Sequence, residues 1–386
     1  MSTKFKLQPL YYFGRDVVKD NLHKELKLLK TKTVLLIYGG GSIKKNGLYN
    51  EIVGACKKCN VKVIEYPGIE PNPRDINIYR AALIARKNKV DLIIAAGGGS
   101  VIDAAKVVGI IATNPQYKNT WDYVLDNSKV KYPSIPLISA VTLAATGSEN
   151  NDGSVITNAQ TKYKMGTATP SATPQICFED PKFQLTLSKW QTACGIFDIF
   201  SHLIEQYFDV NKSFLWTSEY ILANMRVVVA CAKVLMKNPK DETARANILW
   251  TSSMALNSIA KFETSGGDWT THRLEHAVSG LWDVEHGAGL ALITPVYLKY
   301  KCSIDKRFQA LCLSMGKSVF GTKTLSDFFK SLDNFIKLLG LPTKYTDFKN
   351  ISKVTPSDIE FLNKHFNYAV KNKNELAKFV FSHIKQ

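Results

Sequence analysis

Two residues with metal-binding side chains lie in an otherwise apolar segment, residues 195–208. Asp198 and His202 are four positions apart, so both lie on the same face of a helix. Burial of an unpaired carboxylate on that face would cost several kcal/mol. A carboxylate and an imidazole directed at one buried point therefore indicate a divalent metal ion, which both groups can ligate.

Three more of the chain's seven histidines lie within residues 272–286. His272 and His276 repeat the spacing of four, and His286 follows a predicted turn. A lone histidine is more often a packed or surface residue than a ligand, but four in this arrangement with Asp198 favour metal binding. Their mixed nitrogen and oxygen donors suit Fe(II), Zn(II) or Mn(II), and the spacing leaves open which of His272 and His276 binds.

The helix that carries the first two of these residues has a well-defined predicted start. Ser188 and Gln191 form a capping box, in which each side chain satisfies a backbone N–H group of the other residue. From about Thr186 onward one helical pattern follows another, and Thr355 with Pro356 marks the start of a late helix. The second half of the chain is therefore predicted to be an all-α domain that carries the metal.

The first half of the chain alternates between short apolar runs and segments with helical periodicity. Strands are predicted at residues 33–38, 61–66, 91–96 and 135–142, and helices at residues 48–59, 75–87 and 101–111. Repeated strand–helix units with short loops form a mostly parallel sheet with helices on both faces. This half is therefore predicted to be an α/β dinucleotide-binding domain that ends near Asp180.

Two glycine-rich turns each follow a predicted strand directly. Gly97, Gly98, Gly99 and Ser100 open a helix whose positive end would face a pyrophosphate, and the glycines let the backbone approach that group closely. Neither turn has the Gly-x-Gly-x-x-Gly pattern or the phosphate-loop pattern, so a tight strand-to-helix connection explains either turn alone equally well. Of the two, this second turn is the better pyrophosphate candidate.

The first glycine turn bears on the choice of dinucleotide. An enzyme that prefers NAD usually has an acid after a strand, which binds the 2′-hydroxyl of the ribose. The turn here contains instead Gly39, Gly40, Gly41, Ser42, Ile43, Lys44 and Lys45. Small residues leave room for a 2′-phosphate, which Ser42 and the lysines can bind, so the sequence predicts NADP(H).

The composition is that of a globular chain, because its 386 residues are 45% hydrophobic and 22% charged, and this length allows two domains. The net charge of +17 comes from lysines dispersed among acids, so we expect no nucleic-acid partner. No apolar run is long enough to cross a membrane, and residues 1–10 lack the core of a signal peptide. The seven cysteines, an odd number that includes Cys56 and Cys59, are expected to be reduced structural residues of a cytoplasmic protein.

Taken together, these motifs resemble those of the iron-containing (group III) alcohol dehydrogenases, most closely the branch of NADPH-dependent butanol dehydrogenases and aldehyde reductases. The resemblance extends from Tyr12 to the C-terminal helices. Its most specific parts are residues 97–106, residues 146–149, and the set of Asp198 with the histidines. It implies a dinucleotide-binding domain at residues 1–182, an all-helical metal-binding domain at residues 183–386, and an active site in the cleft between them.

Carried over position by position, the resemblance implies a role for each residue of the site. The implied ligands of the metal, Fe(II) in the first place, are Asp198, His202, His272 and His286. His276 would serve as the catalytic residue in proton transfer beside the nicotinamide, and Asn151 and Trp269 would be walls of the substrate pocket. The turn from Gly97 to Ser100 would hold the pyrophosphate. The other residues implied in binding NADP(H) are Gly39, Gly40, Gly41, Ser42, Lys44, Asp103, Thr142, Thr146, Ser148 and Lys164.

The implied reaction is hydride transfer from NADPH to an aldehyde whose oxygen the metal polarises. The expected substrates are aldehydes like butyraldehyde, reduced to primary alcohols, and the expected assembly is a homodimer. A dehydroquinate-synthase-like lyase would need several basic residues around a phosphorylated substrate, and the histidine stretch has only Arg273. A glycerol-dehydrogenase-like enzyme and a non-catalytic metal- or nucleotide-binding protein are the remaining alternatives.

Overall fold

The computed structural model describes residues 9–209, 214–262, 264–370 and 374–384. The chain divides into two compact units, unit 1 (Met1–Leu187) and unit 2 (Ser188–Gln386), so the division falls shortly after the predicted boundary at residue 182. The sequence predicts that residues 1–10 lack a signal peptide. Residues 1–8 of this stretch lie outside the described residues.

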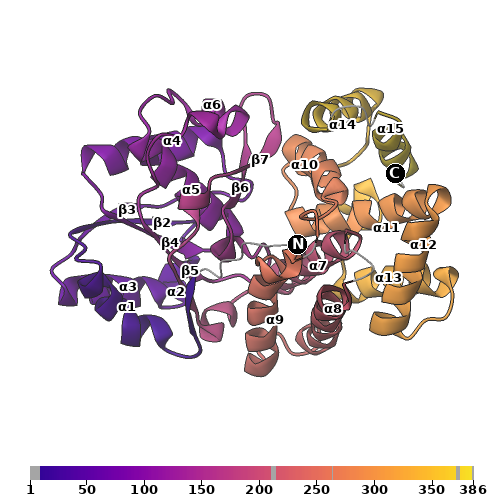
Figure 1. Ribbon diagram of the computed structural model, residues 1–386, viewed down its shortest axis with the longest axis horizontal. Helices are drawn as coiled ribbons and strands as arrows, with labels where there is room; N and C mark the ends of the chain where they lie inside the picture. Colours follow the sequence, from indigo (N-terminus) through magenta and orange to yellow (C-terminus); the bar gives the residue numbers. More distant parts are fainter. Residues whose placement is uncertain (1–8, 210–213, 263, 371–373, 385–386) are drawn as a thin grey trace. The chain divides into compact units, whose positions relative to one another are not determined.

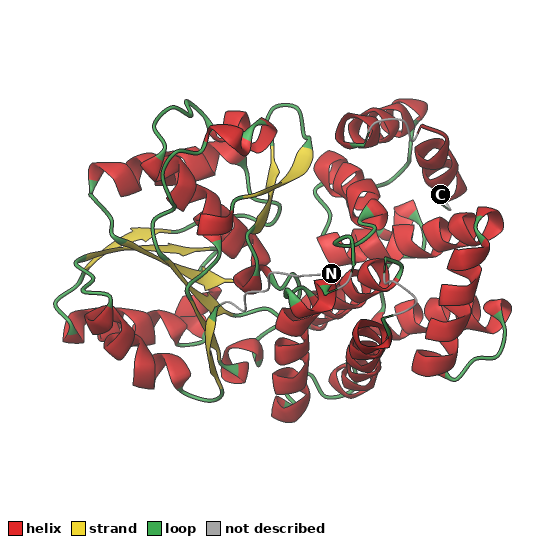
Figure 2. Ribbon diagram, in the orientation of Figure 1, coloured by secondary structure: helices red, strands yellow, loops and turns green. Residues whose placement is uncertain are grey.

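Unit 1 is built on a six-stranded sheet in which all neighbouring strands are parallel. The strands, in sheet order, are β1 (Leu10–Phe13), β8 (Ile176–Glu179), β5 (Leu137–Val141), β4 (Leu92–Gly97), β2 (Thr33–Tyr38) and β3 (Lys62–Tyr66). β4 and β5 are buried along their whole length, as expected for strands that are covered on both faces. The predicted parallel sheet is therefore confirmed (Figure 2).

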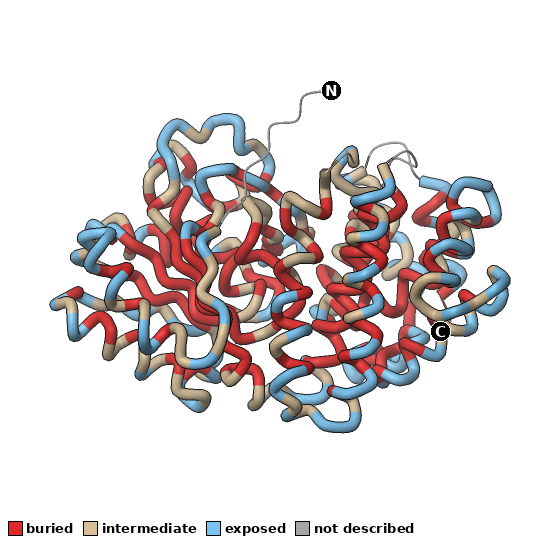
Figure 3. Tube along the Cα trace, turned by 60° about the horizontal axis from the view of Figure 1, so that its bottom comes forward, coloured by how far each residue is buried: buried red, intermediate tan, exposed pale blue. Residues whose placement is uncertain are grey.

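Helices cover both faces of this sheet (Figure 1). One face carries α1 (Val17–Leu28), α2 (Ser42–Lys45) and α3 (Leu48–Lys58), and the other carries α4 (Asp75–Lys87), α5 (Gly99–Thr113) and α6 (Thr120–Leu125). In Figure 3 the tube through the central strands is red, which marks the core of the unit. All residues of α5 except Ser100 and Thr113 are buried, so its charged residues Asp103 and Lys106 need partners inside the protein.

Four strands of unit 1 have no counterpart among the predicted elements. β1 and β8 have four residues each, and β6 (Gly153–Thr157) and β7 (Lys164–Ala168) have five each. β6 and β7 form a separate antiparallel hairpin, which follows the short helix η2 (Ser148–Asn150). The pairing of β1 with β8 joins distant parts of the chain, since Leu10 lies opposite Ile176, whereas β6 and β7 are neighbours in sequence.

Unit 2 consists of helices in the part of the chain that the structure describes (Figure 2). The α-helices are α7 (Lys189–Tyr207), α8 (Leu215–Leu235), α9 (Glu242–Ala255), α10 (Thr270–Trp282), α11 (His286–Ile304), α12 (Lys306–Met315), α13 (Leu325–Leu339), α14 (Pro356–Ala369) and α15 (Asn374–His383). Both predicted helix starts are confirmed, because Ser188 with Gln191 and Thr355 with Asp358 form capping boxes. None of the helices in the described ranges is both long and apolar enough to cross a bilayer.

Candidate functional site

The predicted metal-binding residues come from three helices of unit 2. α7 carries Asp198 and His202 one turn apart, and it is buried from Thr192 to Tyr207. α10 carries His272 in its first turn, and His286 is the first residue of α11. Both α10 and α11 pack against α7, and only residues 283–285 separate them, so the chain returns His286 to the same region as His272.

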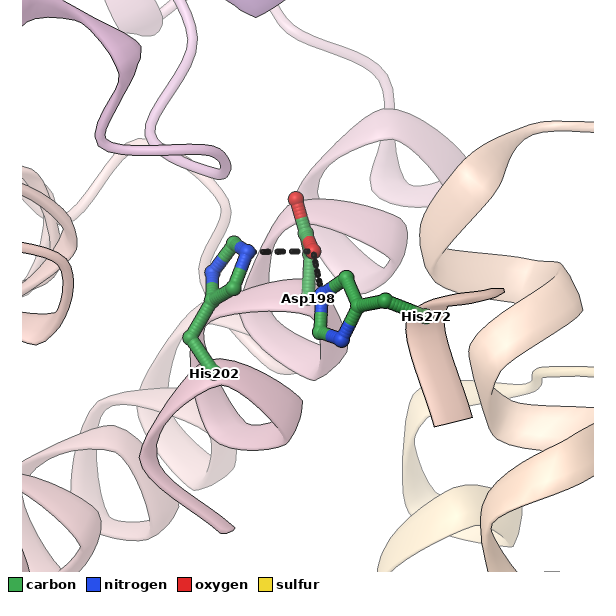
Figure 4. A group of neighbouring side chains, drawn as sticks. All are labelled: Asp198, His202 and His272. Atoms are coloured by element: carbon green, nitrogen blue, oxygen red, sulfur yellow. Dashed lines mark ion pairs between the residues drawn. The ribbon is translucent and has the colours of Figure 1, made fainter. Parts of the chain in front are cut away.

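One carboxylate oxygen is the meeting point of three histidine rings. Asp198 Oδ1 lies 3.6 Å from Nε2 of His202 and 3.7 Å from Nε2 of both His272 and His286. Figure 4 shows the rings of His202 and His272 on either side of the aspartate. These separations are too long for hydrogen bonds, whereas two ligands at about 2.1 Å from a tetrahedral ion lie about 3.4 Å apart. The ligand atoms of Asp198, His202 and His272 all lie within 4.8 Å of one another, as the donors of one metal ion do, and His286 approaches the same carboxylate oxygen.

The same atoms show a further property of a metal site. Asp198 Oδ1 and His272 Nε2 are buried and have no hydrogen-bond partner among the described residues. Leaving a buried charged group in this state costs more than the about 1–3 kcal/mol of a neutral one. A divalent cation would satisfy both atoms at once, and one oxygen with three nitrogens is a donor set for Fe(II), Zn(II) or Mn(II). The residues present therefore fit a metal ion.

The pKa values of Asp198, His202 and His272 are shifted by burial and by their neighbours in ways that bear on metal binding. Burial works to raise the pKa of Asp198, but the neighbouring histidines outweigh it and hold that pKa well below its usual range. Burial lowers the pKa of His202 to about 3, so its ring is neutral and its Nε2 can act as a ligand. Burial also works against protonation of His272, but Glu205 and Asp198 outweigh it and raise the pKa to about 9. A metal ion would replace the proton that the Nε2 of His272 then holds.

Two buried glutamates contact the far side of two of these rings. Glu205 on α7 accepts a hydrogen bond from Nδ1 of His272 and another, of 2.6 Å, from the backbone N–H group of Thr271. Glu275 on α10 accepts a hydrogen bond from Nδ1 of His286. Neither glutamate is among the residues predicted from the sequence. A signal existed for Glu205, because it lies in the same apolar segment as the first two ligands, where an ionisable side chain needs a partner.

His276 and Trp269 lie beside the four converging residues. The ring centroid of His276 is 5.6 Å from that of His286, and the side chain is half-buried. The ring centroid of Trp269 is 5.9 Å from that of His202 and 5.3 Å from that of His272, so the indole packs against the ligand rings. Trp269 also has φ = 53°, a conformation that a bulky residue adopts rarely and mostly at functional sites.

In unit 1, the two glycine turns flank the point where the strand order reverses. From β2 the chain goes outward to β3, then returns past β2 to β4 and continues to β5. Ligands of open parallel sheets bind outside the carboxyl ends of the strands at such a point. The turn that begins at Gly39 follows β2, and Gly97 ends β4, so both turns lie at this edge of the sheet.

The start of α5 offers free backbone donors to an anion. Gly98 precedes the helix and cannot cap it with a side chain, and the N–H groups of Gly99 and Ser100 have no acceptor among the described residues. Unclaimed N–H groups at a helix N-terminus bind phosphate groups. A Cβ atom on Gly99 would lie 2.3 Å from the side chain of Thr146, so only glycine allows Thr146 to approach the helix start. The turn therefore fits a pyrophosphate.

Asp103 and Ser148 lie in a buried polar network behind this turn. Ser148 Oγ donates a hydrogen bond to Asp103, and Lys106 Nζ donates one of 2.8 Å to Ser148 Oγ. Lys106 also contacts Asn151 Oδ1 at 3.2 Å and the carbonyl oxygen of Gly153 at 2.6 Å. These bonds fasten residues 146–153 to α5, so Asp103, Ser148 and Asn151 hold in place the loop that includes Thr146.

Thr142 is hydrogen-bonded to the second glycine turn, and Lys164 is hydrogen-bonded to a loop that contacts the first. The N–H group of Thr142 donates a 3.0 Å hydrogen bond to the carbonyl group that ends β4. Lys164 is buried at the start of β7 and donates a 2.8 Å hydrogen bond to Asn72 Oδ1. The loop that contains Asn72 is itself tied to the first turn, because Gly68 N donates to Gly39 O at 3.1 Å.

An acid absent from the predicted site lies close to the first glycine turn. Glu65, in β3, accepts hydrogen bonds of 2.6 Å from the hydroxyl groups of Tyr38 and Tyr49. These two bonds hold the pKa of Glu65 below its usual range. Lys44 Nζ lies 3.6 Å from the same carboxylate and 4.7 Å from the ring centroid of Tyr49. Gly40 and Ser42 remain exposed, and a Cβ atom on Gly40 would meet no atom within 4 Å.

Both halves of the chain match models of one protein family. Residues 9–181 match the family of iron-containing alcohol dehydrogenases, and residues 192–379 match the C-terminal domain of the Fe-containing alcohol dehydrogenase family. The chain therefore belongs to the iron-containing alcohol dehydrogenase family. It is an oxidoreductase of that class, and the family implies a metal ion and a nicotinamide cofactor.

Individual relatives show how far the similarity extends. NADH-dependent butanol dehydrogenase B of Clostridium acetobutylicum is 37% identical over 89% of this chain and 88% of its own length. NADPH-dependent aldehyde reductase YqhD of Escherichia coli is 30% identical over 86% of each chain. The crystal structure of NADH-dependent butanol dehydrogenase A from Thermotoga maritima has a TM-score of 0.92, is 30% identical, and covers 100% of this chain and 99% of its own.

Proposed function

We propose that this protein interconverts a primary alcohol and its aldehyde with NADP(H) and a divalent metal ion, Fe(II) in the first place. The proposed substrates are short aliphatic compounds such as butyraldehyde and butanol, and the proposed direction is reduction of the aldehyde. The observation that carries this proposal is the convergence of three histidine Nε2 atoms on Asp198 Oδ1, at 3.6–3.7 Å, in a buried site.

In this proposal, Asp198, His202, His272 and His286 bind the metal ion, which when bound supplies Lewis-acid polarisation of a substrate oxygen. The indole of Trp269 packs against two of the ligand rings, so it limits the access of water to them and forms a wall for an apolar substrate. In unit 1, the start of α5 binds the pyrophosphate of the cofactor, which carries the hydride.

His276 is the proposed group for proton transfer. A reduced aldehyde needs a proton on its oxygen, and an imidazole can hold and release one near neutral pH. His276 neighbours His286, with ring centroids 5.6 Å apart, and the histidines that converge on Asp198 Oδ1 are the other three, so we assign His276 to proton transfer although it also forms a possible donor group with Glu275 and His286. Water is the alternative source of the proton.

The choice of NADP(H) rests on the first glycine turn. Gly40 and Ser42 leave space at the carboxyl end of β2, and Lys44 adds positive charge there. An acid such as Glu65 in the neighbouring strand would favour NAD(H), but its carboxylate already accepts hydrogen bonds from two tyrosine hydroxyls and lies 3.6 Å from Lys44 Nζ. The relatives divide on this point, since their names include both NADH-dependent and NADPH-dependent enzymes. The ratio of kcat/KM for NADPH and NADH decides between the two cofactors.

One assay tests the proposed activity directly. The protein is purified anaerobically, its metal content is measured, and oxidation of NADPH and NADH is followed with a panel of C3 to C6 aldehydes. We expect about one divalent ion per chain, with turnover that disappears on chelation and returns on addition of Fe(II). Turnover that is unchanged after complete removal of the metal would refute the metal-dependent mechanism.

The cysteines and the size of the chain bear on the compartment and the assembly of the protein. All seven cysteines are free thiols, which suits a reducing cytoplasm. We propose a cytoplasmic homodimer, without nucleic-acid or membrane partners, and light scattering of the purified protein measures its mass against the 43.1 kDa of one chain.

A further inference from the structure

Two histidines of the metal site have a buried carboxylate on the ring nitrogen that faces away from Asp198. Glu205 contacts Nδ1 of His272, and Glu275 contacts Nδ1 of His286. Both glutamate side chains are buried, so water does not compete for these hydrogen bonds. His202 differs, because its Nδ1 has no hydrogen-bond partner among the described residues.

The carboxylates determine which nitrogen of each ring carries a proton. A carboxylate only accepts hydrogen bonds, so the Nδ1 atoms of His272 and His286 must be the donors. The lone pair of the neutral ring is then on Nε2, which is the atom that faces Asp198 Oδ1 in both cases. A negative charge on the far side of an imidazole also makes its Nε2 a stronger donor to a cation.

Glu205 has a second contact that couples two helices. Its other oxygen accepts the hydrogen bond from the N–H group of Thr271, in the first turn of α10. The residue before α10 provides no side-chain cap, so this carboxylate, which comes from α7, satisfies a backbone donor of the helix start. The same side chain therefore fixes both the position of α10 and the orientation of the His272 ring.

Glu275 occupies a space that the sequence keeps open on α11. A Cβ atom on Gly289 would lie 2.6 Å from Glu275 Oε1 and 2.8 Å from its Cγ. Glycine at this position therefore allows the carboxylate to lie between α10 and α11, where it reaches the ring of His286.

We propose that Glu205 and Glu275 are positioning residues, which hold the rings of His272 and His286 in the tautomer and orientation that bind the metal. Within the described ranges no residue does this for His202, whose ring packs against that of His272 with centroids 4.6 Å apart. This inference rests on the metal site proposed above. Part of the affinity of the site for a metal ion then comes from two residues that do not ligate the metal.

Binding of Co(II) to the metal-free protein tests the role of the glutamates separately from turnover. The variants are Glu205→Gln and Glu275→Gln, which keep the size of the side chain and remove its charge. Glu285→Gln is the matched control, because it removes the same charge one residue before His286 from an exposed side chain. Affinity is measured by competition with a chelator, and the visible spectrum of bound Co(II) reports its coordination.

We expect each of the two variants to bind Co(II) about 10- to 100-fold more weakly, with an altered spectrum at saturation, and the control to match the wild type. Gly289→Ala should weaken binding in the same direction, because its methyl group displaces Glu275 without changing any charge. Loss of the hydrogen bond that caps α10 would lower the stability of the metal-free protein, which thermal unfolding measures. By itself, this loss would leave the spectrum of the protein saturated with Co(II) unchanged.

The outcomes distinguish this inference from the proposed function. Wild-type affinity and spectrum in both glutamine variants would overturn the inference alone, provided that the wild type binds metal and reduces aldehydes. Equal weakening in Glu285→Gln would also overturn it, because the effect would then come from charge at a distance. A wild-type protein that binds no Co(II) would overturn both proposals.

Discussion

Replacement of Gly287 by alanine should remove the metal without touching any ligand. Gly287 follows His286 in the first turn of α11, where that helix crosses α7. An added Cβ atom would lie 1.9 Å from the carbonyl oxygen of Cys194 and 2.6 Å from its carbonyl carbon. Both are backbone atoms, so no side-chain rotation can relieve the clash.

The size of the required shift follows from these distances. Real Cβ contacts essentially never fall below 3.0 Å, so the two helices must separate by at least the difference, 3.0 − 1.9 = 1.1 Å. Distances from ligand atoms to a metal tolerate only about 0.2 Å. His286 should therefore lose its place beside Asp198, and the overpacked interface should cost about 1–3 kcal/mol in the free energy of unfolding.

Metal analysis and thermal unfolding of purified Gly287→Ala check this prediction. Gly54→Ala is the matched control, because Gly54 lies inside helix α3 and an added Cβ atom meets nothing within 4 Å. The control should keep its metal and be as stable as the wild type or more stable, since alanine favours helix by about 1 kcal/mol over glycine. A Gly287→Ala protein with full metal content and wild-type turnover would show that His286 does not depend on the close contact between α7 and α11.

Three further predictions concern individual residues of the site. Asp198→Asn and His202→Ala should each lower bound metal and abolish turnover together, because each removes a ligand from a buried site; full occupancy at wild-type rates would exclude the site. The wild type should prefer NADPH, and Gly40→Asp should shrink or reverse that preference in kcat/KM, because the new carboxylate repels a 2′-phosphate and accepts a ribose hydroxyl. A wild type that already prefers NADH would contradict the interpretation of this turn. His276→Ala should retain metal and NADPH binding while kcat falls on the order of 100-fold and its pH profile changes. Loss of metal would instead make His276 a ligand, and an unchanged enzyme would leave the proton to water.

Local patterns in the sequence predicted most of the elements that position the site. The bounds of β2 (Thr33–Tyr38) and α4 (Asp75–Lys87) are the predicted ones, and the capping box of Ser188 and Gln191 starts α7 as predicted. These features depend on residues that are close in sequence, such as an apolar run, a helical periodicity or a cap. β1 and β8 were not predictable in the same way, because four residues give only a short pattern and their pairing joins parts of the chain that are far apart in sequence.

The site, like the fold, was predictable only where the residues concerned are close in sequence. The spacing of Asp198 and His202 indicated a metal, since both lie on one face of a buried helix. The spacing of His272 and His276 did not show which of them would face Asp198, and the structure brings Nε2 of His272 to that carboxylate. Glu205 and Glu275 were beyond prediction as partners of histidine rings, because the contact of Glu205 with His272 spans 67 positions and depends on how α7 and α10 pack.

The pairing of β1 with β8 has a consequence for how the chain folds during synthesis. β1 is made before β8, its neighbour in the sheet, which ends at Glu179. At about 5–20 residues per second, roughly 10–30 s pass before the partner strand leaves the ribosome. During that time Leu10 and Phe13, which stay 54% and 41% exposed even in the folded chain, belong to a strand without a neighbour. A shortened N-terminus that lacks β1 would leave β8 as the new edge of the sheet, and an unprotected edge strand promotes pairing between chains.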